Sequence, residues 1–149
     1  MRFILLILMI LILPSCFEQT DCLINNTNIL KITLKGKTLG KDTTVTFISI
    51  YVLKDENVLY TNQALGTLEV PLETTDSAET VVFNYMEMTK SVSDTLVITY
   101  RNELRVISPD CGAFLYQHDI NVPHTTFEKT RVITSVLLTT DKKNLEIFL

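Results

Sequence analysis

Three cysteines and two histidines are the residues of this chain best suited to chemistry. The cysteines are Cys16, Cys22 and Cys111, and the histidines are His118 and His124. A cysteine can carry a lipid, form a disulfide, ligate a metal or act as a nucleophile. A histidine can ligate a metal or transfer a proton. The neighbours of each residue decide between these uses.

Cys16 follows a segment typical of an export signal. Arg2 precedes an unbroken apolar run from Phe3 to Leu13, and Pro14 and Ser15 lead to the cysteine. Eleven helical residues span about 16 Å, too short for a hydrocarbon core of roughly 30 Å. One basic residue, a short apolar stretch and a small residue before the cut indicate a secretory signal.

The last four residues of that segment, Leu13-Pro14-Ser15-Cys16, resemble the lipobox of bacterial lipoproteins. The resemblance implies cleavage after residue 15, a diacylglyceryl group on the Cys16 sulfur and an acyl chain such as palmitate on its new amine. A cysteine with three acyl chains holds a protein stably on a lipid bilayer. The alternative is an ordinary cysteine in an ordinary signal or a short anchor.

Cys22 and Cys111 form an even pair in a chain expected to be exported, where disulfides persist. We expect a Cys22–Cys111 disulfide, and two buried free thiols are the alternative. Only residues 17–21 separate Cys16 from Cys22. Six steps of extended chain reach at most about 21 Å, so the disulfide would hold the domain close to the membrane.

Catalytic and ligand motifs are not evident in the sequence. His118 and His124 are the candidates for metal binding, with Asp119 and Glu128 nearby, but their spacing matches no standard ligand pattern. We therefore expect no metal and no cofactor. The sequence has no G-x-S-x-G elbow for a serine hydrolase and no glycine-rich phosphate loop. We expect no catalytic residues and no enzymatic activity.

The length and net charge of the chain narrow its domain organisation and the classes of function that it could have. Residues 16–149 have the size of one domain. Loss of Arg2 with the signal leaves 12 basic and 17 acidic side chains, a net charge of −5. This charge disfavours nucleic-acid binding, which relies on basic surfaces. We divide the chain into a signal peptide (1–15), a lipidated cysteine with a short tether (16–28) and a single β-rich domain (29–149).

Alternating apolar and polar residues predict strands along the whole domain. Leu30, Ile32 and Leu34 alternate with polar residues, and residues 45–53 suit a central strand covered on both faces. Arg101-Asn102-Glu103 is interpreted as a hairpin tip. Short strands with frequent turns predict an all-β fold, an antiparallel β-sandwich of immunoglobulin-like or related topology. The other expected strands cover residues 58–60, 66–72, 80–86, 94–100, 104–107, 113–117, 130–139 and 145–149.

Several short motifs accompany this strand pattern. They are the lipobox, Asp21-Cys22, the strand start Ser93-Asp94-Thr95-Leu96, the segment Ile107-Ser108-Pro109-Asp110-Cys111-Gly112, and His124-Thr125-Thr126 before an apolar final strand. The combination resembles an uncharacterised domain-of-unknown-function family of small β-rich lipoproteins from Bacteroidetes-type bacteria. That family has no assigned activity, so the resemblance implies a fold and a compartment but no function.

The expected function is that of a membrane-anchored envelope lipoprotein, a non-enzymatic binding or assembly module with an envelope protein as its possible partner. The expected location is the outer membrane, facing the periplasm, because the residues after Cys16 poorly resemble a surface-export signal. A carrier of a small hydrophobic ligand is the alternative, and it requires an apolar cavity. An envelope hydrolase or metal-dependent enzyme is the third reading.

Overall fold

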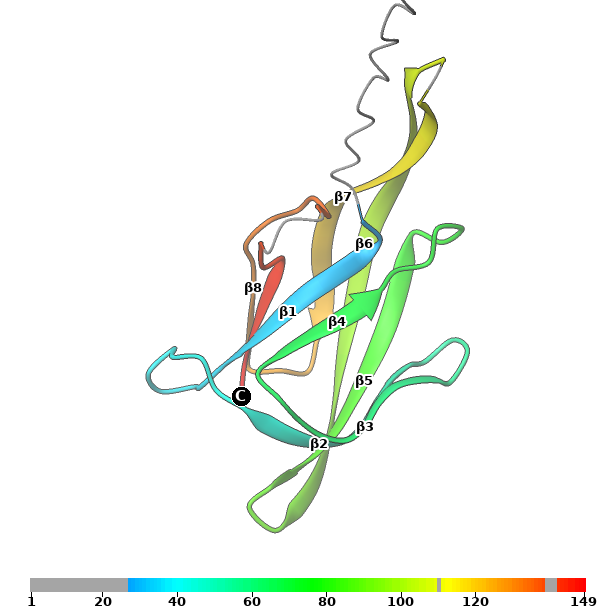
Figure 1. The fold of residues 1–149 in the computed structure, drawn as a ribbon. Helices are drawn as coiled ribbons and strands as arrows, with labels where there is room; N and C mark the ends of the chain where they lie inside the picture. The colour runs from blue at the N-terminus through cyan, green and yellow to red at the C-terminus, as the bar shows by residue number, and fades with distance from the viewer. Residues whose placement is uncertain (1–26, 110, 139–141) are drawn as a thin grey trace, which may run out of the picture.

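The computed structural model describes residues 27–109, 111–138 and 142–149, and this part of the chain is built from strands (Figure 1). The all-β fold predicted from the sequence is confirmed. No helix of the described residues is long and apolar enough to cross a membrane. The strands are β1 (Ile29–Lys35), β2 (Val45–Val52), β3 (Asn57–Leu65), β4 (Thr67–Pro71), β5 (Ala78–Glu87), β6 (Lys90–Ser108), β7 (Gly112–Thr125), β8 (Lys129–Val132) and β9 (Leu145–Phe148).

The strands form two sheets. One has the order β4-β1-β9-β8, and the other has the order β3-β2-β5-β6-β7. Neighbouring strands are antiparallel, except that β1 and β9 are parallel. This pair joins the first and last described strands, with Ile32 opposite Leu145 and Leu34 opposite Ile147. The order agrees with the predicted sandwich, in which each sheet covers the apolar face of the other.

Period-2 alternation places the core between the sheets. Leu30, Ile32 and Leu34 of β1 are fully buried, as are Phe83 of β5 and Phe47 of β2. The rings of Phe83 and Phe47 lie 6.0 Å apart. β1 belongs to the four-stranded sheet, whereas β2 and β5 belong to the five-stranded sheet, so their buried side chains join the two layers into one core.

The strands expected at residues 58–60 and 113–117 are longer in the structure, where they are β3 and β7. Two other predicted boundaries are wrong. The hairpin tip expected at Arg101-Asn102-Glu103 does not exist, because β6 continues to Ser108 while β7 pairs with it past this point. The long strand expected over residues 130–139 ends at Val132. The amides of Ile133 and Thr134 donate to the carbonyl of Asn144 at 2.8 and 3.2 Å, so the chain leaves the sheet there.

The structure also differs from the prediction for β2, which was expected to be covered on both faces. It is an inner strand between β3 and β5, but Ile48 is 40% exposed. A two-layer sandwich covers only one face of each sheet, whereas a strand rich in β-branched residues also suits a fully covered position.

Asn144 fastens β1 to the segment before β9. Its side-chain oxygen accepts from the amide of Lys31 at 2.9 Å, and its side-chain nitrogen donates to the carbonyl of Val136 at 3.0 Å. The residue is 3% exposed. Its side chain therefore satisfies a donor and an acceptor that water reaches poorly.

Asn144→Ala should lower the free energy of unfolding by about 1–3 kcal/mol, because it leaves these partly buried backbone groups without their side-chain partner. Equilibrium unfolding in urea measures the loss. Lys142→Ala, at an exposed position two residues away, is the control and should change stability by less than about 0.5 kcal/mol. Equal losses in the two variants would contradict this role of Asn144.

Candidate functional site

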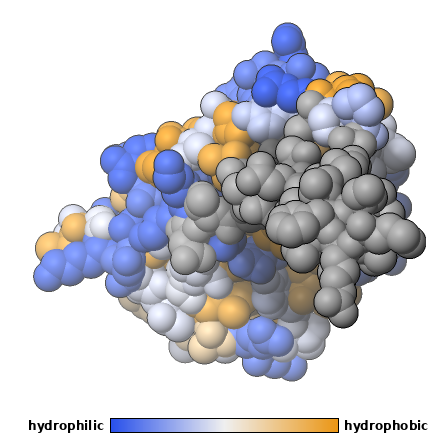
Figure 2. Space-filling model, turned by 45° about the horizontal axis from the view of Figure 1, so that its top comes forward, coloured by the Kyte–Doolittle hydropathy of each residue, from blue (hydrophilic) through white to orange (hydrophobic). Residues whose placement is uncertain are grey.

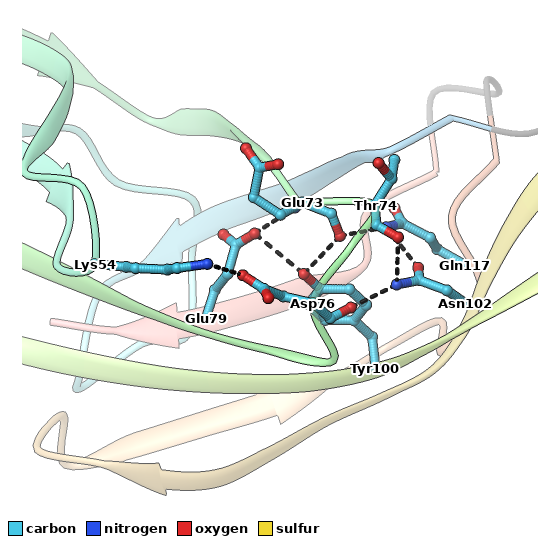
Figure 3. Close-up of polar contacts among 8 residues, drawn as sticks. All are labelled: Lys54, Glu73, Thr74, Asp76, Glu79, Tyr100, Asn102 and Gln117. Carbon is cyan, nitrogen blue, oxygen red and sulfur yellow. Dashed lines mark hydrogen bonds and ion pairs between the residues drawn. The ribbon is translucent and has the colours of Figure 1, made fainter.

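A buried polar cluster lies where β6 and β7 extend beyond the neighbouring strands (Figure 3). We call it the base cluster, because it lies at the base of the projection that these two strands form. It consists of Glu73, Glu79, Tyr100, Asn102 and Gln117. Glu79 is in β5, Tyr100 and Asn102 are in β6, Gln117 is in β7, and Glu73 is in the loop between β4 and β5. Glu79, Tyr100 and Gln117 are at most 4% exposed. The cluster therefore joins three strands and a loop around groups removed from water.

Tyr100 is the centre of this cluster. Its hydroxyl lies 2.8 Å from the carbonyl oxygen of Glu73 and 3.1 Å from Oε1 of Glu79. The amide of Glu73 donates to the same Oε1. A tyrosine hydroxyl has one proton, so it can donate to only one of its two neighbours. When Tyr100 donates to Oε1 of Glu79, the carboxylate form of Glu79 satisfies that contact; when Tyr100 donates to the Glu73 carbonyl, the contact with Oε1 needs a protonated Glu79.

Burial raises the pKa of Glu79, and the hydrogen bonds from the Glu73 amide and the Tyr100 hydroxyl oppose the increase. The negative charges of Glu73 and Asp76 raise this pKa further. Burial and the nearby Glu79 also raise the pKa of Tyr100 well above its ordinary value, so this hydroxyl keeps its proton.

The amides of Asn102 and Gln117 hold the loop against the two strands (Figure 3). Asn102 Nδ2 donates to the carbonyls of Thr74 and Asp76 at 3.0 and 2.5 Å. Gln117 Nε2 donates to the Glu73 carbonyl at 3.2 Å and to Asn102 Oδ1 at 2.9 Å. Oε2 of Glu79 and Oε1 of Gln117 have no partner among the described residues. The cluster therefore positions the loop between β4 and β5 against β6 and β7.

The raised pKa of Glu79 predicts a pH dependence of stability. The folded state binds this proton more tightly than the unfolded chain, so its contribution is fully present below pH 4.5 and is lost as the pH rises through the folded pKa. Glu79→Gln should therefore become more stable relative to the parent as the pH increases from 4 towards neutral. Urea unfolding across that range measures the difference. Glu128→Gln, at an exposed position, is the control, and a constant difference for Glu79→Gln would contradict the prediction.

Starting at the base cluster, β6 and β7 form a two-stranded projection (Figure 1). We call it the arm and define it as Arg101–Ser108 of β6 with Gly112–His118 of β7. Its register places Leu104 opposite Leu115 and Val106 opposite Ala113. Leu104 and Val106 are 69% and 75% exposed. Figure 2 turns this end towards the viewer and shows hydrophobic surface interspersed with hydrophilic residues. The arm therefore carries apolar side chains that no described part of the protein covers.

The opposite face of the arm is polar and aromatic. The guanidinium carbon of Arg105 lies 4.2 Å from the centre of the Tyr116 ring, and its NH2 lies 3.1 Å from Glu103. Nε2 of His118 lies 3.2 Å from Glu103, and the His118 ring lies 5.5 Å from that of Tyr116. The ion pair and the hydrogen bond with Arg105 lower the pKa of Glu103, so this carboxyl is ionised at neutral pH.

The two histidines lie in one strand rather than in one site. Both belong to β7, and they lie opposite Arg101 and Val97 of β6. Those two partners are four extended steps apart, or about 13 Å, which is beyond the reach of shared metal ligands. His118 contacts Glu103 and Asp119, whereas His124 is exposed and lies opposite Val97. Among the described residues, no group of three or more His, Cys, Asp or Glu side chains is arranged to hold a metal ion.

The cysteines are only partly described. Cys16 and Cys22 lie outside the described residues, so lipidation and the disulfide with Cys111 stay predictions. Cys111 lies in the turn that joins β6 to β7 at the tip of the arm, and its amide donates to Ser108 Oγ at 3.0 Å.

The base cluster was not predicted from the sequence, although a signal for it was present. Glu79 has the same parity as the apolar residues Val81 and Phe83 of the predicted strand 80–86. Asn102 likewise continues the alternation of Ile98 and Tyr100. Extending each pattern by one more residue would have placed Glu79 and Asn102 on the inner face, where a polar group needs a partner.

Comparisons with known proteins identify one match. The model of a family of unknown function (DUF6452) matches residues 44–149. The matched region includes β2 to β9 and therefore the whole base cluster and arm, whereas β1 precedes it. No curated protein and no solved structure matches the chain.

Proposed function

Because the chain belongs to this family of unknown function, we propose its role from its own residues: a lipid-anchored envelope lipoprotein that acts as a non-enzymatic binding or assembly module. The observation that carries the proposal is the sequence Leu13-Pro14-Ser15-Cys16 after an apolar run that is too short to span a bilayer. Its acylated cysteine would hold the domain at the membrane.

The geometry of the described domain supports an anchored module. The carbonyl of Asn28 accepts from the amide of Leu72 at 2.7 Å, and the next residue, Glu73, belongs to the base cluster. The chain thus enters the domain beside the base of the arm. An anchor upstream would bring this end of the sandwich to the bilayer and leave the opposite end facing the aqueous compartment.

The proposed location is the outer membrane on its periplasmic side, in bacteria of the Bacteroidetes type. Metabolic labelling with palmitate followed by membrane fractionation tests the anchor. The parent should be labelled and remain with the membrane, whereas Cys16→Ser should lose both properties. A Cys16→Ser variant that is processed and retained like the parent would overturn the proposal.

Crosslinking and co-purification of the lipidated protein from native membranes test the assembly role. We expect one reproducible envelope partner that is lost in Cys16→Ser. An abundant monomer with no partner would contradict the assembly role. Mass spectrometry of small molecules retained by that monomer would then test the carrier alternative.

A further inference from the structure

We propose that the tip of the arm contacts the lipid surface directly, with Leu104 and Val106 inserted among neutral lipids. The inference rests on the proposed lipid anchor and assigns the exposed face of the arm to one occupant. The face is formed by side chains of the same parity as the core residues Leu96 and Ile98. It therefore continues the inner surface of the sheet beyond the end of the sandwich.

The exposure of these side chains differs from that of the core residues they follow. Leu96 and Ile98 are fully buried, whereas Leu104 and Val106 are 69% and 75% exposed. β5 pairs with β6 only as far as Thr99, and the part of β6 beyond it pairs with β7 alone. Adjacent exposed apolar residues on an extended element are typical of contact surfaces.

The length of chain before the described residues allows the arm to reach the bilayer. Eleven steps from Cys16 to Thr27 span at most about 36–40 Å. The arm extends five residues from Gln117 to Gly112, or about 17 Å beyond the base cluster. An anchor that enters beside the base can therefore bring the tip to the membrane. The short linker also keeps the local concentration of lipid high, so a weak apolar contact is sufficient.

The charges of the arm favour neutral lipid. Arg105 is paired with Glu103 at 3.1 Å, and Arg101 is paired with Asp119 at 3.6 Å. These pairs leave no excess of basic groups to attract anionic headgroups. Tyr116 lies on the other face beneath Arg105, and tyrosine is enriched at membrane interfaces because one end is apolar and the other is polar.

A single tryptophan can report this contact, because the chain has none. Leu104→Trp places the reporter on the arm. Met88→Trp is the control, at a 98% exposed position in the β5–β6 turn, which lies at the opposite end of the molecule (Figure 1). Each lipidated, full-length mature variant is reconstituted in neutral phosphatidylcholine vesicles, with and without brominated lipid. Circular dichroism verifies that both variants keep the fold.

The expected result is blue-shifted emission and strong quenching by brominated lipid for Leu104→Trp, and neither effect for Met88→Trp. Adding Val106→Ser to the Leu104→Trp chain should reduce the quenching. Equal emission from both reporters, without quenching, would overturn the inference. A blue shift that depends on protein concentration in detergent and is not quenched by the lipid would also overturn it and would indicate a second copy as the occupant.

The same experiment separates the inference from the proposed function. If the lipidated protein stays with the vesicles while the reporter at position 104 is not quenched, the anchor stands and the arm contact fails. If native protein carries no lipid on Cys16, the proposed function fails before any reconstitution.

Discussion

Replacement of Phe83 by alanine should lower the free energy of unfolding by about 3–5 kcal/mol, the usual cost of removing a fully buried aromatic ring. Phe83 is 0% exposed. Its ring lies 6.0 Å from that of Phe47 and 5.2 Å from that of Phe127, with the Phe127 ring nearly perpendicular. Ring pairs of this kind contribute beyond the area that they bury.

The position of Phe83 explains why the surroundings cannot close the cavity easily. β5 lies between β2 and β6, the middle of the five-stranded sheet, so its backbone is fixed by ladders on both sides. A domain of this size has roughly 5–15 kcal/mol of stability in total, so the variant should be only marginally folded.

Urea unfolding of the unlipidated mature chain, with Cys16→Ser in every variant, measures the effect. Met88→Ala is the control, because Met88 is 98% exposed, and it should change stability by less than about 0.5 kcal/mol. A loss below about 1.5 kcal/mol for Phe83→Ala would contradict the packing described for this ring.

Loss of the predicted Cys22–Cys111 disulfide should have an effect of similar size. The bridge would close a loop of 89 residues. The chain-entropy model assigns about 4–5 kcal/mol to such a loop, and measured losses for native disulfides are about 2–5 kcal/mol. Cys111 stands at the tip of the arm, so the bridge would tie the tip to the predicted tether.

The test compares Cys22→Ser, Cys111→Ser and the double variant. If the two residues are paired, all three variants should lose the same stability, because each removes the same bond. Alkylation of the unreduced chain, again with Cys16→Ser, should label no thiol. Two labelled thiols together with additive losses would show that the pairing is wrong.

The strand faces could be predicted from the sequence with good accuracy. The alternation of Leu30, Ile32 and Leu34 is set by the pleat of the backbone, in which successive side chains point to opposite faces. All three residues are buried as this period requires. Val81 and Phe83 follow the same local rule, because no distant residue is needed to establish it.

The strand ends could not be predicted in the same way. Arg101-Asn102-Glu103 has the polar composition of a turn, but β6 passes through it because β7 supplies a partner from Ser108 back to Leu96. The early end of β8 depends on Asn144, twelve residues downstream of Val132. Both outcomes are decided by contacts between distant residues, which local propensity does not describe.

The sequence alone determined the all-β class and the inward faces of the strands, because each depends on residues adjacent or alternating along the chain. The lipid signal at Cys16 stays a prediction from the sequence. Only the tertiary structure decided that β1 and β9 pair in parallel, that Glu79 is buried beneath Tyr100, and that Leu104 and Val106 lie beyond the sandwich. The alternation of side chains along a strand specifies the face on which each one lies. The order of the strands and the length over which they overlap determine what that face contacts.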